Sequence, residues 1–221
     1  MKNGQFESAD CRERMARDPL TGGQIRIGVM GSADGHAEPT VLESCRRLGR
    51  SIAENGCCLL TGACPGLPHI TVLGAKDTGG HVVGISPAAT LKEHVEVLSS
   101  PYEEYDVLIF TGLGLMGREL INIRSSDIVI VVGGHSGTLG EFAIAYEEGK
   151  LIGILAGTGG ITEALPALEK TIAKSTGSEV IYASDPEELV TRLLDRYLSG
   201  KYVCPCHPDT KSRSRINKQE V

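Results

Sequence analysis

The 221-residue sequence contains no tryptophan, and its aromatic residues amount to only 4%. So few rings argue against the stacking platforms that bind single-stranded nucleic acids. Positive charge is scarce as well, because 22 Lys and Arg residues stand against 28 Asp and Glu residues, for a formal net charge of -6. An acidic chain repels a long polyanion, although a local phosphate pocket is compatible with it. We therefore expect no long nucleic acid as a partner.

Long apolar runs are also absent. No stretch of the sequence approaches the roughly 20 residues that a helix needs to span a bilayer, and residues 1–20 lack the hydrophobic segment of a secretory signal. The seven cysteines are odd in number, and four of them lie in predicted core elements: Cys45, Cys57, Cys58 and Cys64. This usage is typical of reduced thiols. We expect a cytoplasmic protein that does not bind a membrane.

Glycine is abundant, with 28 residues, and it follows most of the apolar runs. Residues 127–132 form a continuous apolar run of the kind found in a strand buried on both faces of a parallel sheet. Further strands are predicted at 24–32, 57–62, 81–86, 107–112, 151–157 and 179–184. Helices are predicted between them, at 39–55, 67–79, 115–126, 138–148 and 161–175, with a last helix at 186–198 capped by Asp185. This alternation predicts an α/β fold with one doubly wound parallel sheet.

The predicted organisation has three parts. A polar leader, loosely attached or partly helical, covers residues 1–23, the α/β domain covers 24–198, and a polar tail covers 199–221. Residues 87–104 are poorly periodic, and we expect a short extended piece at 94–98 within them. The strand at 107–112 is expected to lie in the core.

Three glycine-containing turns are predicted at the carboxyl edge of the sheet, where a phosphate commonly binds. They supply the candidate phosphate-binding residues Gly31, Ser32, Gly62, Gly66, Gly133, Gly134, Gly137 and Thr138. Their spacing fits neither the dinucleotide-binding nor the P-loop pattern, and no acidic residue ends the second strand. A nicotinamide dehydrogenase is therefore disfavoured, and a P-loop NTPase is excluded.

The third turn leads into a helix for which two interpretations of Glu141 are open. Thr138 can act as the N-cap, and Glu141 three residues later would complete a capping box. In that case the glutamate is structural. The alternative is that Glu141 faces a ligand.

Residues 118–141, RELINIRSSDIVIVVGGHSGTLGE, resemble the signature of the LONELY GUY (LOG) family, whose members are also described as lysine-decarboxylase-like. The resemblance spans roughly residues 25–184. It places Arg118 on the family's catalytic arginine and Glu141 on its catalytic glutamate. It implies a phosphoribohydrolase that cleaves the N-glycosidic bond of a nucleoside 5′-monophosphate, without a cofactor and as a homodimer. No lysine lies in a recognisable pyridoxal-phosphate context, so lysine decarboxylation is not expected.

The sequence departs from the LOG pattern at several positions. Gly133 replaces a proline and His135 a glycine, Glu119 replaces a lysine, Gly140 replaces a polar or acidic residue, and Ala63 and Cys64 replace glycines. Residues 111–114, 124–127 and 133–134 instead resemble the molybdenum-cofactor carrier proteins, although Glu119 departs from that pattern too. This resemblance implies the alternative of a non-catalytic carrier or sensor for a pterin or nucleotide phosphate.

Three further residues are weaker candidates. Arg124 is a candidate phosphate ligand, or it pairs with Asp127 at the helix end. His69 is a weak candidate for ligand contact. Cys64 could be an activated thiol at a helix N-terminus, but without an identifiable partner base we expect a buried or half-buried thiol. Cys204, Cys206 and His207 have ligand chemistry, but no second cluster accompanies them, so no metal site is predicted.

Overall fold

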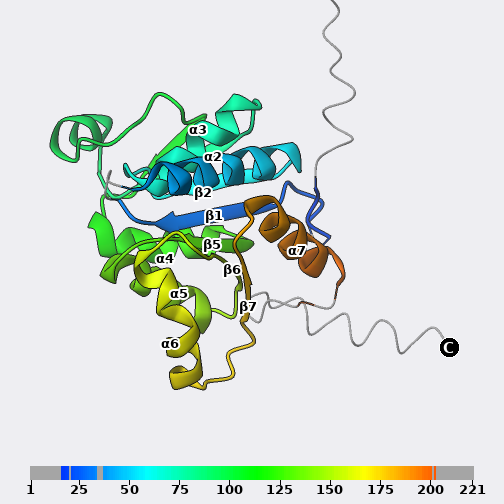
Figure 1. Ribbon diagram of the computed structural model, residues 1–221. Coiled ribbons are helices and arrows are strands. Elements are labelled where there is room, and N and C mark those ends of the chain that lie inside the picture. Colours follow the sequence, from blue (N-terminus) through cyan, green and yellow to red (C-terminus); the bar gives the residue numbers. More distant parts are fainter. Residues whose placement is uncertain (1–15, 20, 34–36, 201, 203–221) are drawn as a thin grey trace, which may run out of the picture.

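The computed structural model describes residues 16–19, 21–33, 37–200 and 202 (Figure 1). In this part of the chain seven parallel strands form one sheet in the order β4-β3-β2-β1-β5-β6-β7. The strands are β1 Arg26–Gly31, β2 Cys58–Thr61, β3 Val82–Ser86, β4 Val107–Phe110, β5 Ile128–Val132, β6 Leu151–Leu155 and β7 Glu179–Ala183. The chain runs outward from β1 to one edge, returns to β5 and runs outward to the other edge. The predicted doubly wound α/β fold is thus confirmed.

Helices cover both faces of the sheet (Figure 1). One face carries α2 (Pro39–Glu54), α3 (Leu67–Asp77) and α7 (Pro186–Leu198), and the other carries α4 (Gly114–Ser125), α5 (Ser136–Glu147) and α6 (Leu165–Ile172). Two short helices complete the described elements, the π-helix η1 (Glu93–Val97) and the 3-10 helix η2 (Gly160–Glu163). As predicted, Asp185 caps α7, accepting a 2.9 Å hydrogen bond from the backbone N–H of Glu188.

The core lies in two layers because successive strand residues point to opposite faces. Ile128 and Ile130 of β5 pack toward α2, α3 and α7, whereas Val129 and Val131 pack toward α4 and α5. Every residue of β5 is buried. The expectation of a strand buried on both faces is confirmed, and β5 lies beside the central strand β1.

Three expected elements differ in the structure. The strand predicted at 107–112 is the edge strand β4, which pairs only with β3, so that Val107 is 44% and Ile109 is 46% exposed. Residues 94–97 are helical rather than extended and Leu98 is the C-cap, and His94 is buried with its ring nitrogens bonded to Ser86 and Pro101. The helix predicted at 161–175 is η2 followed by the shorter α6, because a proline in the first turn of α6 starts a new helix there.

The described ends of the chain pack against the domain. Asp18 in the predicted leader is buried and accepts a hydrogen bond from the hydroxyl of Tyr197 on α7. Tyr202 in the predicted tail is buried and donates to the carbonyl of Gly149. These residues of the leader are therefore anchored rather than loosely attached. The possible metal ligands of the tail lie outside the described residues: Cys204, Cys206 and His207. Within the described part of the chain, no helix is long and apolar enough to cross a membrane.

Candidate functional site

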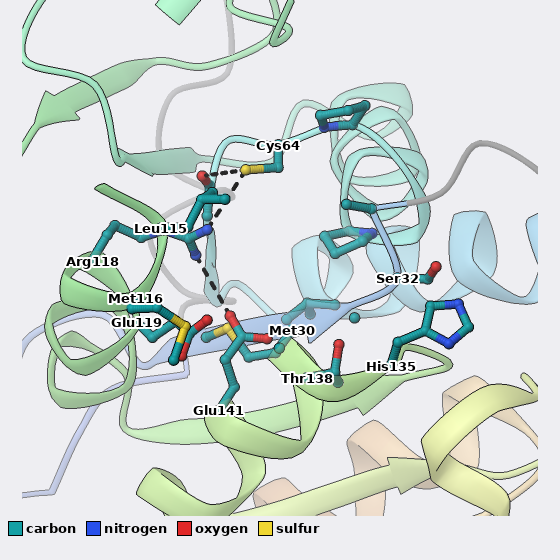
Figure 2. Close-up of a pocket in the computed structure, with 17 residues that line it drawn as sticks. Met30, Ser32, Cys64, Leu115, Met116, Arg118, Glu119, His135, Thr138 and Glu141 are labelled. Atoms are coloured by element: carbon teal, nitrogen blue, oxygen red, sulfur yellow. Dashed lines mark hydrogen bonds and ion pairs between the residues drawn. The ribbon is translucent and has the colours of Figure 1, made fainter. Parts of the chain in front are cut away.

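A cavity of about 280 Å³ opens at the carboxyl ends of β1, β2 and β5. Residues of β1, α4 and α5 line it, together with residues of the turns after β1 and β2. Seven of the predicted site residues line it: Gly31, Ser32, Gly62, Arg118, Gly137, Thr138 and Glu141. Figure 2 shows Arg118, Glu119 and Glu141 at one side of the cavity, and Ser32 and His135 at the other. The charged side chains are thus gathered at one end.

Arg118 on α4 is only 6% exposed, and its guanidinium spans the charged end of the cavity. Its Nη1 lies 3.5 Å from Oε1 of Glu141, and its Nη2 donates to Sγ of Cys64 at 3.6 Å (Figure 2). In the amide orientation that satisfies both of its polar atoms, Asn122 accepts from Nη1 at 3.3 Å. These contacts fix the guanidinium in the pocket wall.

Gly62 makes room for this arginine. A Cβ atom on Gly62 would lie 2.0 Å from Nη1 of Arg118, far inside van der Waals contact. Because Gly62 has no side chain, the guanidinium of Arg118 can occupy this space. The backbone N–H of Gly62 also points to the Asn122 oxygen, at 3.3 Å in the same amide orientation.

Glu141 on α5 is 7% exposed and faces Arg118. Burial raises the pKa of its carboxyl from 4.5 to about 7; Arg118 opposes this rise and the nearby Glu119 adds to it. A carboxyl group that titrates near neutral pH can both take up and release a proton under physiological conditions. Its burial, its raised pKa and its contact with Arg118 make Glu141 a candidate for acid–base chemistry.

The predicted capping box is wrong. Helix α5 begins at Ser136, with His135 as its N-cap and no cap hydrogen bond from that side chain in the described structure. Thr138 is the third residue of the helix and is buried, so Glu141 is the sixth residue and lies beyond the first turn. The sequence-based expectation placed the start too late because Ser136 and Gly137 do not continue the apolar pattern.

This earlier start leaves the amino end of α5 open to the cavity. Gly137 and Thr138 belong to the first turn, whose backbone N–H groups have no partner within the helix. These groups and the positive end of the helix dipole favour an anion. His135 is exposed and lines the same end of the cavity.

Two departures from the LOG pattern, Glu119 and Gly140, lie next to each other in the structure. Glu119 on α4 is 5% exposed, and its carboxylate lies over the glycines of α5. A Cβ atom on Gly140 would be 3.4 Å from Oε2 of Glu119, and one on Gly137 would be 3.8 Å from Oε1. A larger side chain at position 140 would occupy the space that the carboxylate uses. Burial raises the pKa of Glu119 despite the opposing effect of Arg118.

The remaining predicted site residues do not line the cavity. Gly66 is the N-cap of α3, with φ +90°, and a Cβ there would lie 2.1 Å from the carbonyl oxygen of Ser32, so it allows the turns after β1 and β2 to pack closely. Gly133 and Gly134 shape the turn between β5 and α5, also with positive φ. Arg124 is exposed and pairs with Glu148 at 2.7 Å.

Arg124 does not pair with Asp127, as one interpretation of the sequence proposed. Asp127 instead binds Arg26, with a shortest distance of 2.6 Å. His69 faces Glu104 at 4.0 Å and lines a different cavity. Cys64 is largely buried, and burial raises the pKa of its thiol, as expected for an unactivated cysteine.

Sequence reasoning missed Asn122 as a site residue. It is fully buried and lies four residues after Arg118, which puts both side chains on one face of α4. That helical spacing was the available signal. Among the described residues no group of three or more His, Cys, Asp or Glu side chains is arranged to hold a metal ion.

The doubly wound sheet and the pocket at its carboxyl edge define a Rossmann-like α/β protein of the LOG type. The chain belongs to the SLOG cluster4 family, whose model matches residues 24–190.

Similar proteins have been found in several organisms. The solved molybdenum cofactor binding protein of Rippkaea orientalis is 33% identical, with a TM-score of 0.62, over 78% of this chain and 98% of that one. The molybdenum cofactor carrier protein of Chlamydomonas reinhardtii is 30% identical, with a TM-score of 0.63, over 80% and 99%. An uncharacterized protein of Archaeoglobus fulgidus is 36% identical over 131 residues, 59% of this chain and 80% of that one. DNA processing protein A of Helicobacter pylori, at 19% identity and a TM-score of 0.53, shares the fold alone.

Proposed function

We propose that the cavity binds a small molecule that carries a phosphate, such as a nucleoside monophosphate. The phosphate would lie at the amino end of α5, beside Thr138 and the turn formed by Gly31 and Ser32. The backbone N–H groups of the first turn of α5, which have no partner within the helix, and the helix dipole favour an anion at this place. The rest of the molecule would extend toward Arg118 and Glu141.

The chemistry that this geometry supports best is hydrolysis of the N-glycosidic bond of a nucleoside 5′-monophosphate. The observation that carries this proposal is the buried pair of Arg118 and Glu141, with a glutamate pKa of about 7. The bond between C1′ and the base nitrogen would break, and the oxygen of a water molecule would bond to C1′. Glu141 would accept the proton of that water and stabilise the positive sugar, and the departing base would gain a proton. Arg118 would orient the substrate.

A non-catalytic carrier of a nucleotide or pterin phosphate is the second candidate. The similarity to molybdenum cofactor carrier and binding proteins at 30% and 33% identity supports it. Glu119 also supports it. This carboxylate lies near Glu141 and raises the pKa of that group, which disfavours the ionised form of Glu141 that would accept a proton from water. In this case the same cavity would hold its ligand without breaking a bond.

Base release separates the two candidates. Purified protein would be incubated with AMP, GMP, CMP and UMP, and free base would be measured by chromatography for the wild type and for Glu141→Gln. Glu96→Gln, which changes an exposed carboxylate on η1, is the matched control. Base released by the wild type and the control but not by Glu141→Gln supports the hydrolase. If no base forms while a nucleotide or pterin phosphate raises the melting temperature, the carrier function is favoured.

We also propose that the protein forms a homodimer through β4 and the first turns of α4. Large apolar side chains are exposed there, including Ile109 at 46%, Leu115 at 57% and Met116 at 71%. Such a group of exposed apolar residues is typical of a protein interface. Because Leu115 and Met116 also line the cavity, a partner subunit on this surface would help to close the site.

A further inference from the structure

Glu119 carries a buried carboxylate that the described residues leave partly without hydrogen bonds. The side chain is 5% exposed, and its Oε2 atom has no donor within the described structure. Nε of Arg118, on the neighbouring residue, likewise has no acceptor there. Leaving buried charged atoms unpaired is costly, and such atoms in a pocket wall point to partners that a ligand supplies.

The fold provides space for this carboxylate in a specific way. Helix α5 presents Gly137 and Gly140 to Glu119, and an added Cβ at Gly140 would come within 3.4 Å of Oε2. At that distance a Cβ would be in ordinary van der Waals contact with the carboxylate, whereas a longer side chain at position 140 would compete with it for space. Glu119 is thus held at the pocket wall between α4 and the glycine-lined face of α5.

The cavity has opposite electrostatic character at its two ends. The amino end of α5 at Gly137 and Thr138 favours an anion. At the other end two carboxylates, Glu119 and Glu141, accompany the single guanidinium of Arg118. A ligand with a phosphate at one end and hydrogen-bond donors at the other would satisfy both ends at once.

We infer that Glu119 selects ligands whose ring presents two adjacent N–H donors, as the 2-amino-4-oxopyrimidine edge of guanine and of pterins does. A carboxylate accepts both hydrogens of that edge side by side. Hypoxanthine keeps the ring N–H but lacks the amino group, and adenine presents a ring acceptor at the same position. This inference rests on the proposed binding of a phosphate-bearing ligand, and it adds the class of ring that is recognised.

The test is a calorimetric titration of the wild-type protein with GMP, IMP, AMP, neopterin monophosphate and ribose 5-phosphate. Chromatography of each mixture checks that the ligand stays intact. GMP or the pterin phosphate should bind at least about fivefold more tightly than IMP and AMP, as expected for a bidentate contact. In Glu119→Gln the preference should narrow to about twofold, because the amide nitrogen cannot accept, while ribose 5-phosphate binds as before. Glu96→Gln should keep the wild-type preference.

The same set of ligands distinguishes a guanine nucleotide from a pterin. Tight binding of GMP supports a guanine nucleotide, and tight binding of the pterin phosphate alone supports a pterin. Equal binding of GMP, IMP and AMP to the wild type, or a preference that survives in Glu119→Gln, would overturn the inference while leaving the phosphate pocket in place. If ribose 5-phosphate and every other ligand fail to bind, the proposed function fails as well. Equal binding of GMP, IMP and AMP to the wild type overturns the inference even if Glu119→Gln does not fold.

Discussion

Replacing Glu141 by glutamine should change how the stability of the protein depends on pH. Burial raises the pKa of Glu141 from 4.5 to about 7 in the folded protein. The folded state therefore binds this proton more tightly than the unfolded state, and the free energy of unfolding falls as the pH rises from about 4.5 to about 7. At 1.36 kcal/mol per pKa unit, the total loss is about 3 kcal/mol. Glutamine at this position does not titrate and should not show that loss.

The assay is urea denaturation of the wild type and Glu141→Gln at pH 5, 6, 7 and 8. The stability of the variant relative to the wild type should increase by about 2–3 kcal/mol between pH 5 and pH 8, and most of the change should occur below pH 7. Glu96→Gln, at an exposed position, should show a pH-independent difference from the wild type. A constant difference for Glu141→Gln over the same range would refute the argument that burial controls this carboxyl group.

Three further changes test the packing around the site and the surface of the domain. Gly62→Ala should destabilise the protein by about 1–3 kcal/mol in urea, because its Cβ would lie 2.0 Å from the Arg118 guanidinium; Gly137→Ala, with its nearest contact at 3.8 Å, should change stability much less. Asp185→Ala should cost about 1 kcal/mol in the same assay through loss of the α7 cap, and an unchanged midpoint would contradict that role. Met116→Glu should convert the proposed dimer into a monomer, as measured by light scattering, whereas a wild type that is already monomeric would exclude the dimer.

Much of the fold could be predicted because its elements leave local signals. The apolar run that forms β5 indicated burial on both faces, and alternating strands and helices with right-handed crossovers restrict the order of a parallel sheet. The edge position of β4 could not be predicted in this way. Its sequence is apolar like that of a core strand, and only the final strand order shows that it has a single neighbour.

The site residues that could be predicted from the sequence are those that belong to one continuous motif. Arg118 and Glu141 lie on either side of β5 in the sequence, and the two helices that flank this strand bring them within 3.5 Å. The relation between Glu119 and Gly140 could not be predicted, because each seemed a separate departure from the family pattern. Only the packing of α4 on α5 places the Glu119 carboxylate beside Gly140, 3.4 Å from where a Cβ would lie.

The central claim is that a phosphate binds at the amino end of α5. A crystal structure of the protein with ribose 5-phosphate tests it most directly. We predict that the phosphate will lie within hydrogen-bond distance of the backbone N–H groups of Gly137 and Thr138, with the sugar directed toward Arg118 and Glu141. A phosphate bound elsewhere, or a sugar phosphate reversed so that its phosphate contacts Arg118, would contradict the account.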